Sequence, residues 1–175
     1  SKKEYRKIGI LGGTFDPPHE GHLYISKIAM KKLKLNRLIW IVTKKNPFKK
    51  KPYLNLNDRM RLVSKLIKKE KKFVVQYLDD KIKSRNTFDL LNYITKKKSG
   101  RKLYFLIGAD NFSKFHKWHN WQKIPDLAKV VVFPRKGFSI KSSDYIAAKK
   151  LNKKDWIYIK SKKLNISSSI IRKFW

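Results

Sequence analysis

The sequence predicts a doubly wound parallel α/β sheet, formed by a single domain over residues 1–175. Two observations support this fold class. Short apolar runs typical of strands alternate with amphipathic runs typical of helices along the whole chain, and parallel strands need such crossovers. A chain of 175 residues with 41% hydrophobic content is long enough for one compact core and short for two.

Six runs rich in β-branched and aromatic residues are expected to form the strands. They are Lys7 to Leu11, Leu38 to Val42, Phe73 to Tyr77, Leu103 to Gly108, Val130 to Phe133 and Trp156 to Ile159. Periodic apolar spacing predicts the helices at Gly21 to Leu33, Asn57 to Lys69, Thr87 to Lys97, Trp121 to Leu127 and Ser142 to Lys150. In doubly wound sheets ligands bind beyond the carboxyl ends of the strands, where strand order reverses, so residues that directly follow strands are the first candidates for a site.

The composition excludes several classes of function. The chain has no cysteine, which rules out a disulfide framework and a thiolate nucleophile. Its longest apolar runs fall far below the roughly 20 residues of a membrane span, so we expect a cytoplasmic protein with no membrane partner. The formal net charge of +33 suggests an anionic partner, but the lysines are spread over many segments. This distribution favours solvated faces over a specific nucleic-acid site.

A loop containing glycines and histidines follows the first expected strand. Its sequence is Gly12-Gly13-Thr14-Phe15-Asp16-Pro17-Pro18-His19-Glu20-Gly21-His22. We expect Gly12 and Gly13 to let the backbone approach a ligand and to leave the strand by a turn that a Cβ would obstruct. His19 and His22 can share one face of the first helical turn, whose free N–H groups attract phosphate. The loop predicts a phosphate site rather than a metal site, since no third histidine or carboxylate stands at ligand spacing.

A second candidate phosphate element follows the last expected strand. It is Ile166-Ser167-Ser168-Ser169-Ile170-Ile171-Arg172. Serines at a helix start cap free N–H groups and offer hydroxyls, while Arg172 presents a planar fork to phosphate oxygens.

Together the two elements resemble the nucleotidylyltransferase superfamily, which has a His-x-Gly-His element in a Gly-Thr-Phe-Asp-Pro context and an Ile-Ser-Ser-x-x-Ile-Arg motif. Three further segments resemble the bacterial nicotinate-nucleotide adenylyltransferases of this superfamily. They are Gly108-Ala109-Asp110 with Trp118, the helix start Asn86-Thr87-Phe88-Asp89, and the loop Asn46-Pro47-Phe48-Lys49 with the following Asp58-Arg59-Met60-Arg61. Thr87 also has the residue type of a simple N-cap, and Trp118 that of a core side chain. The loop departs from the family's Pro-Pro-His-Lys pattern at Phe48, and His119 stands where the family has tyrosine.

The resemblance implies a Rossmann-like nucleotidylyltransferase fold and adenylyl transfer from ATP to nicotinate mononucleotide. It implies ATP binding by Gly12, Gly13, Thr14, Phe15, His19, His22, Gly108, Asp110, Ile166, Ser168, Ser169 and Arg172. It implies nicotinate mononucleotide binding by Lys49, Thr87, Trp118, His119 and Arg135. His19, His22 and Arg172 are the expected catalytic residues, with Mg²⁺ carried on the ATP phosphates and no metal ligand from the protein.

Two alternatives remain at this point. A phosphopantetheine adenylyltransferase-like enzyme shares both phosphate motifs, although Gly108-Ala109-Asp110 with Trp118 is not expected there. A basic nucleic-acid-binding protein would account for the net charge of +33. The expected partners are the small-molecule substrates alone, with the enzyme a monomer or a homodimer.

Overall fold

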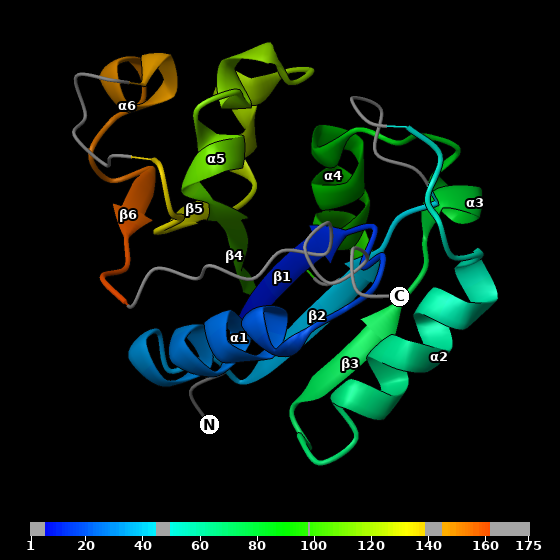
Figure 1. The fold of residues 1–175 in the computed structure, drawn as a ribbon. Helices are drawn as coiled ribbons and strands as arrows, with labels where there is room; N and C mark the ends of the chain where they lie inside the picture. The colour runs from blue at the N-terminus through cyan, green and yellow to red at the C-terminus, as the bar shows by residue number, and fades with distance from the viewer. Residues whose placement is uncertain (1–5, 45–49, 98, 139–144, 162–175) are drawn as a thin grey trace.

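The structure is a computed structural model that describes residues 6–44, 50–97, 99–138 and 145–161. Its strands form one six-stranded sheet in the order β3-β2-β1-β4-β5-β6, and all neighbouring strands are parallel (Figure 1). The strands are β1 (Lys7–Gly13), β2 (Arg37–Val42), β3 (Phe73–Gln76), β4 (Lys102–Gly108), β5 (Lys129–Phe133) and β6 (Trp156–Tyr158). The strand order reverses between β1 and β4, so the ligand crevice of such a sheet lies at the carboxyl ends of these two strands.

The expected fold class and all six expected strands are confirmed, with ends that differ by one or two residues. The helices are α1 (Glu20–Lys32), α2 (Leu56–Leu66), α3 (Asp79–Ile82), α4 (Thr87–Lys97), α5 (Ala109–Phe112) and α6 (Ile146–Lys150), with the 3₁₀ helices η1 (Phe115–Lys117) and η2 (Trp121–Asp126). α3, α5 and η1 were not predicted, because three or four residues are too few to show a helical period.

One helix prediction is wrong in type. The segment predicted as a helix from Trp121 to Leu127 forms the 3₁₀ helix η2, with Pro125 inside it. Proline lacks the N–H of an α-helical hydrogen bond and its ring clashes with the preceding turn, so the tighter form is favoured here. For the helix predicted from Ser142, only the part from Tyr145 onward lies within the described residues, and it contains α6.

The helices cover both faces of the sheet and bury a separate apolar cluster on each. α1 and α2 cover one face, where Ile25, Ala29 and Val63 pack against residues such as Leu38 and Trp40. On the opposite face α4, α5, η1, η2 and α6 pack against alternate strand residues (Figure 1). This double coverage explains why the central strands are apolar on both sides.

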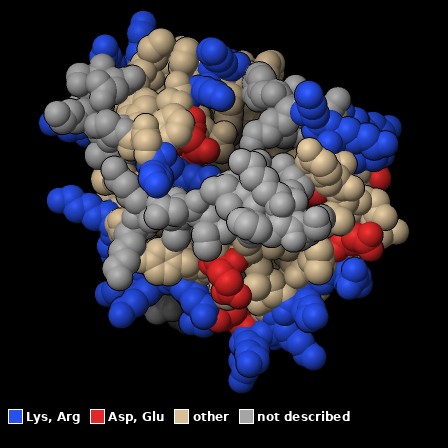
Figure 2. Space-filling view, in the orientation of Figure 1, with Lys and Arg blue, Asp and Glu red and all other residues tan. Residues whose placement is uncertain are grey.

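On the face of the molecule shown in Figure 2, basic side chains are spread over several regions rather than gathered into one tract. Across the described ranges, no helix has the length and apolar character needed to cross a membrane.

Candidate active site

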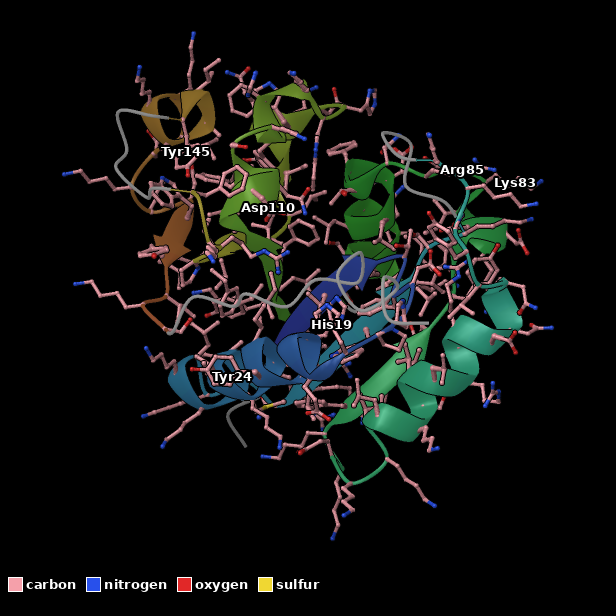
Figure 3. All side chains as sticks on the ribbon, in the orientation of Figure 1. His19, Tyr24, Lys83, Arg85, Asp110 and Tyr145 are labelled. Atoms are coloured by element: carbon pink, nitrogen blue, oxygen red, sulfur yellow. The ribbon has the colours of Figure 1, made fainter. Side chains whose placement is uncertain are left out.

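The predicted phosphate loop lies at the point where the strand order reverses. β1 ends at Gly13 and pairs with β2 on one side and β4 on the other. The chain then returns to begin α1 at Glu20, with His19 as its N-cap (Figure 3). The N-terminus of α1 therefore faces the crevice of the sheet, where its free N–H groups favour an anion.

Backbone hydrogen bonds fix the orientation and the tautomer of both histidines. The Gly21 N–H donates to His19 Nδ1 at 3.1 Å, and the His19 N–H donates to His22 Nδ1 at 3.1 Å. A ring nitrogen that accepts a hydrogen bond carries no proton, so each neutral ring has its proton on Nε2. The ring centroids are 3.9 Å apart and the ring planes differ by 26°. The first turn of α1 thus presents two Nε2–H donors side by side.

Both histidines are neutral near physiological pH. Burial, and after it the positive charge of Arg135, lowers the pKa of His19 from 6.5 to about 4. Burial, followed by the charges of His19 and Arg135, holds the pKa of His22 well below 6.5. Neutral rings can act on an anion only by donating hydrogen bonds, and the positive charge of the region comes from Arg135 and the dipole of α1.

Buried side chains pack against His22 and hold the histidine pair in place. The Phe15 ring stacks on Trp40 with centroids 5.0 Å apart and planes differing by 7°, and it lies 4.8 Å from the His22 ring. The Trp40 indole N–H donates to Ser26 Oγ at 2.9 Å, and that hydroxyl donates to the His22 carbonyl at 2.8 Å. Phe15 is buried, so its ring serves to support the histidine pair.

We expected a Cβ at Gly12 or Gly13 to obstruct the turn after β1. This expectation is wrong, because the protein leaves room for a Cβ at both positions. An added Cβ at Gly12 meets no described atom within 4 Å, and one at Gly13 meets only the Phe15 ring at ordinary contact distance, 3.6 Å. The space above these two glycines is open, as a close backbone approach to a ligand requires. Gly108 is different, because an added Cβ would lie 2.5 Å from Asp110 Oδ1 and 3.1 Å from Arg135 Cγ.

Asp110 and Arg135 meet after the carboxyl ends of β4 and β5, near the histidines. Asp110 lies in α5 directly after β4 (Figure 3), and Arg135 follows β5. Arg135 Nε lies 3.6 Å from Asp110 Oδ1, and both side chains are partly exposed. Arg135 is also close enough to lower the pKa of both His19 and His22. The structure therefore brings Gly108, Asp110 and Arg135 together with the histidine pair.

Of the predicted acceptor-binding residues, Thr87, Trp118 and His119 lie on the face of the sheet that α4 covers. Trp118 packs with its ring edge-on to Phe105, 6.1 Å between centroids, and tilted against Phe115 at 5.2 Å. His119 lies edge-on to Phe88, 6.2 Å between centroids, which places it beside the start of α4 at Thr87. Trp118 is half-buried, so it contributes to the core and retains an accessible part.

Thr87 is not the cap of α4. The Asp89 N–H donates to Asn86 Oδ1 at 2.9 Å, and the Asn86 amide donates to Asp89 Oδ2 at 2.9 Å, so Asn86 caps the helix. The capping explanation for Thr87 is therefore wrong, and its hydroxyl is left for another role.

Five predicted site residues lie outside the described ranges. They are Lys49, Ile166, Ser168, Ser169 and Arg172.

Sequence reasoning assigned no site role to four residues that shape the site, namely Asp16, Ser26, Trp40 and Arg59, although Asp16 and Arg59 lie in segments that it quoted. Arg59 carried a detectable signal, because it is spaced four residues from Val63 and eight from Ile67, on the apolar stripe of its helix. A charged residue on such a stripe needs buried partners. Trp40 and Ser26 gave no such signal, since both suit an ordinary core.

Comparison with known proteins agrees with this architecture. The cytidylyltransferase-like family model matches residues 10–174. A probable nicotinate-nucleotide adenylyltransferase of Pelagibacter ubique (strain HTCC1062) is 45% identical over 167 residues, which cover 95% of this chain and 92% of the relative. A probable nicotinate-nucleotide adenylyltransferase of Clostridium tetani (strain Massachusetts / E88) is 37% identical over 174 residues, which cover 95% and 86%.

A solved structure has the same fold. Plasmodium falciparum nicotinic acid mononucleotide adenylyltransferase complexed with APC has a TM-score of 0.77 to this chain at 20% identity, covering 97% of this chain and 84% of that one. The fold and the histidine loop define a nucleotidyltransferase. The chain belongs to the cytidylyltransferase-like family and, within it, to the nicotinate-nucleotide adenylyltransferases.

Proposed function

We propose that this enzyme transfers the adenylyl group of ATP to the 5′-phosphate of nicotinate mononucleotide. The products are nicotinate adenine dinucleotide and pyrophosphate, so the reaction is a step of NAD biosynthesis. The observation that carries the proposal is the pair of fixed Nε2–H donors, His19 and His22, at the N-terminus of α1 in a chain of this family.

The reaction is an in-line attack by the phosphate of the acceptor on the α-phosphorus of ATP. It requires no enzyme nucleophile, and the protein contributes positioning and stabilisation of the charge on the phosphoryl oxygens. His19 and His22 donate to those oxygens from Nε2. The open backbone at Gly12, Gly13 and Thr14 lies along the phosphates, while Ser168, Ser169 and Arg172 hold the triphosphate.

The acceptor binds on the opposite side of the crevice. Trp118 supports the pyridine ring with an accessible face, and backbone N–H groups near Thr87 and His119 bind its carboxylate. Arg135 and Lys49 add positive charge for the acceptor phosphate, and Asp110 offers a carboxylate to ribose hydroxyls. Arg135 supports this assignment because its charge already acts on both histidines.

Mg²⁺ enters as part of the substrate. Among the residues that the structure describes, no three histidine, cysteine, aspartate or glutamate side chains are grouped so that they could hold a metal ion. Mg²⁺ keeps several waters and binds phosphate oxygens readily, so MgATP can bring its own ion. We expect the enzyme to work in the cytoplasm as a monomer or homodimer, with no specific nucleic-acid partner.

A pyrophosphate-release assay with MgATP and four acceptors tests the proposal. The acceptors are nicotinate mononucleotide, nicotinamide mononucleotide, phosphopantetheine and glycerol 3-phosphate, and a His19→Ala/His22→Ala double variant is the negative control. We expect nicotinate mononucleotide to give the highest kcat/KM. A higher value with phosphopantetheine would contradict the acceptor, and equal rates in the double variant would contradict the site.

A further inference from the structure

Arg59 connects three segments of the site through backbone carbonyls. It lies in the first turns of α2 and is 2% exposed. Its Nη1 donates to the Thr14 carbonyl at 2.8 Å and to the Thr43 carbonyl at 2.6 Å. Its Nη2 donates to the Lys44 carbonyl at 3.1 Å, and its Nε donates to the Leu54 carbonyl at 3.1 Å. One guanidinium thus joins the phosphate loop, the end of β2 and the segment before α2.

Two aspartates accept hydrogen bonds from backbone N–H groups of the segments whose carbonyls Arg59 binds. Asp16 accepts from the Tyr53 N–H at 2.7 Å through Oδ2 and from the Leu54 N–H at 2.8 Å through Oδ1. Asp79 Oδ2 accepts from the Lys44 N–H at 2.8 Å. Leu54 and Lys44 therefore each have their N–H bound by a carboxylate and their carbonyl bound by Arg59. Burial lowers the pKa of the Arg59 guanidinium, and the negative charges of Asp16 and Asp79 oppose that lowering.

The hydrogen bond from Arg59 to the Thr14 carbonyl fixes the orientation of the Thr14–Phe15 peptide. The Thr14–Phe15 peptide is trans, because the cis bond in the described ranges is Asp16–Pro17. In a planar trans peptide the C=O and N–H point in opposite directions, so the Phe15 N–H faces away from Arg59. Phe15 has φ of 51°, a left-handed conformation that a bulky residue rarely adopts without support. The support comes from Arg59 at its peptide and from Trp40 at its ring.

We propose that Arg59 is a positioning residue for adenylyl transfer, which holds the Thr14–Phe15 peptide so that the Phe15 N–H faces the substrate phosphates. It also fixes the Thr43–Lys44 and Tyr53–Leu54 segments against the phosphate loop. The inference rests on the proposed function.

A purely structural explanation of Arg59 is weaker. The next residues on this stripe of α2, Val63 and Ile67, are apolar and buried, so an apolar side chain at position 59 would complete the stripe. Replacing a whole buried ion network by apolar groups of similar volume is often neutral or stabilising for folding, although removing only one of its partners is destabilising. An arginine here instead supplies several donors in a fixed planar arrangement, which suits the binding of carbonyls from separate loops.

Steady-state kinetics and thermal unfolding of Arg59→Met and Arg59→Lys test the role. For Arg59→Met we expect kcat to fall by on the order of 10²-fold at saturating MgATP, with a much smaller change in the KM for ATP, because misplaced donors act mainly on the transition state. Lysine retains the charge but not the planar set of donors, so Arg59→Lys should recover only part of kcat.

Two matched variants separate positioning from stability and from charge. Val63→Ala creates a cavity one turn further along α2, where the residue is 0% exposed, and should lower the melting temperature while changing kcat less than about 2-fold. Arg61→Met removes the same charge from the exposed side of α2, where Arg61 pairs with Asp58, and should change neither quantity.

The outcomes separate this inference from the proposed function. Each variant is assayed at the same number of degrees below its own melting temperature. If Arg59→Met or Arg59→Lys then loses no more kcat than Val63→Ala, the positioning role is overturned. If Arg59→Met does not fold, the comparison of Arg59→Lys with Val63→Ala decides. If the unsubstituted enzyme itself releases no pyrophosphate with any acceptor, the proposed function fails instead.

Discussion

The histidine side of the crevice and the acceptor side are held in different ways. His19 and His22 are fixed by backbone donors, a stacked Phe15 and the buried Trp40–Ser26 pair. On the acceptor side, Trp118 and His119 make ring-edge contacts, and Arg135 and Asp110 are 3.6 Å apart and partly exposed. Under the proposed mechanism, this difference leads us to expect that the first side is preorganised for the transition state and that the second adapts to its ligand. Substitutions should therefore lower turnover on the first side and change affinity or specificity on the second.

The largest effect is expected on the histidine side. Replacing His22 by alanine should lower kcat by on the order of 10²-fold or more, with a modest change in ATP affinity, because the donor matters most in the transition state. His19→Ala should act similarly, with a larger effect on ATP binding. The measurement is steady-state pyrophosphate release at varied ATP, and an unchanged kcat would exclude His22 from the mechanism.

Amide replacements of His22 sharpen this prediction. A glutamine amide can reach near the Nε2 position, whereas an asparagine amide ends near Nδ1. Since the structure assigns the proton to Nε2, His22→Gln should retain more activity than His22→Asn. Greater activity in His22→Asn would contradict the assigned tautomer.

A smaller effect is expected from the choice of acceptor. Nicotinate mononucleotide should be used with about 10- to 100-fold higher kcat/KM than nicotinamide mononucleotide, because a carboxamide would turn a donor toward a donor at a cost of about 1–3 kcal/mol. The difference should increase at low ionic strength, where the additional negative charge of the acid is less screened. Equal use of both acceptors at two salt concentrations would argue against the assigned pocket.

Arg135 links the two sides, and its removal should be detectable on both. In Arg135→Met the pKa of His19 should rise from about 4 toward 6.5, since the lowering due to the positive charge is lost while burial remains. The KM for nicotinate mononucleotide should also increase. NMR titration of the imidazole protons measures the first quantity. The neighbouring exposed Lys136→Met is the control, and an equal pKa change in that variant would remove the special role of Arg135.

The smallest effect concerns stability against pH. The pKa of His19 is lowered in the folded protein, so between pH 6.5 and about 4 the unfolded chain binds a proton there that the folded chain does not. The stability contributed by neutral His19 is complete above pH 6.5 and is lost as pH falls toward 4. His22 acts in the same direction because its pKa is also lowered. Melting temperatures should therefore fall over this range, and less steeply in His19→Gln than in the control His119→Gln, an exposed position. Equal slopes of melting temperature against pH in the two variants would show that His19 is not a source of this pH dependence.

The fold was predictable because its signals are local. Each strand is a continuous apolar run such as Leu38 to Val42, and the phosphate loop is contiguous from Gly12 to His22. The 3₁₀ form of η2 was missed, although Pro125 indicates it. Thr87 was considered as an alternative N-cap of α4, whereas the cap is Asn86, because neighbouring residues of similar capping ability differ only in backbone geometry.

The arrangement of the site was less predictable because it depends on contacts between distant segments. Arg59 binds the carbonyl of Thr14, 45 positions away in sequence, and no local pattern specifies that pairing. The tautomers of His19 and His22 follow from two hydrogen bonds that appear only once the first turn of α1 exists. The sequence indicates which residue types meet a phosphate, and tertiary contacts decide which atoms they present.

The neutrality of His19 and His22 also affects product release. A protein with a formal net charge of +33 attracts anions of every kind, including the pyrophosphate that it releases. Two uncharged donors bind strongly only to an oxygen in line with their N–H bonds, since hydrogen-bond strength falls steeply with angle. Once the bond to the α-phosphorus is broken and the oxygens move out of line, most of that attraction is lost. Under the proposed mechanism, we therefore expect directional bonding at the reacting centre to limit product inhibition in this strongly basic enzyme.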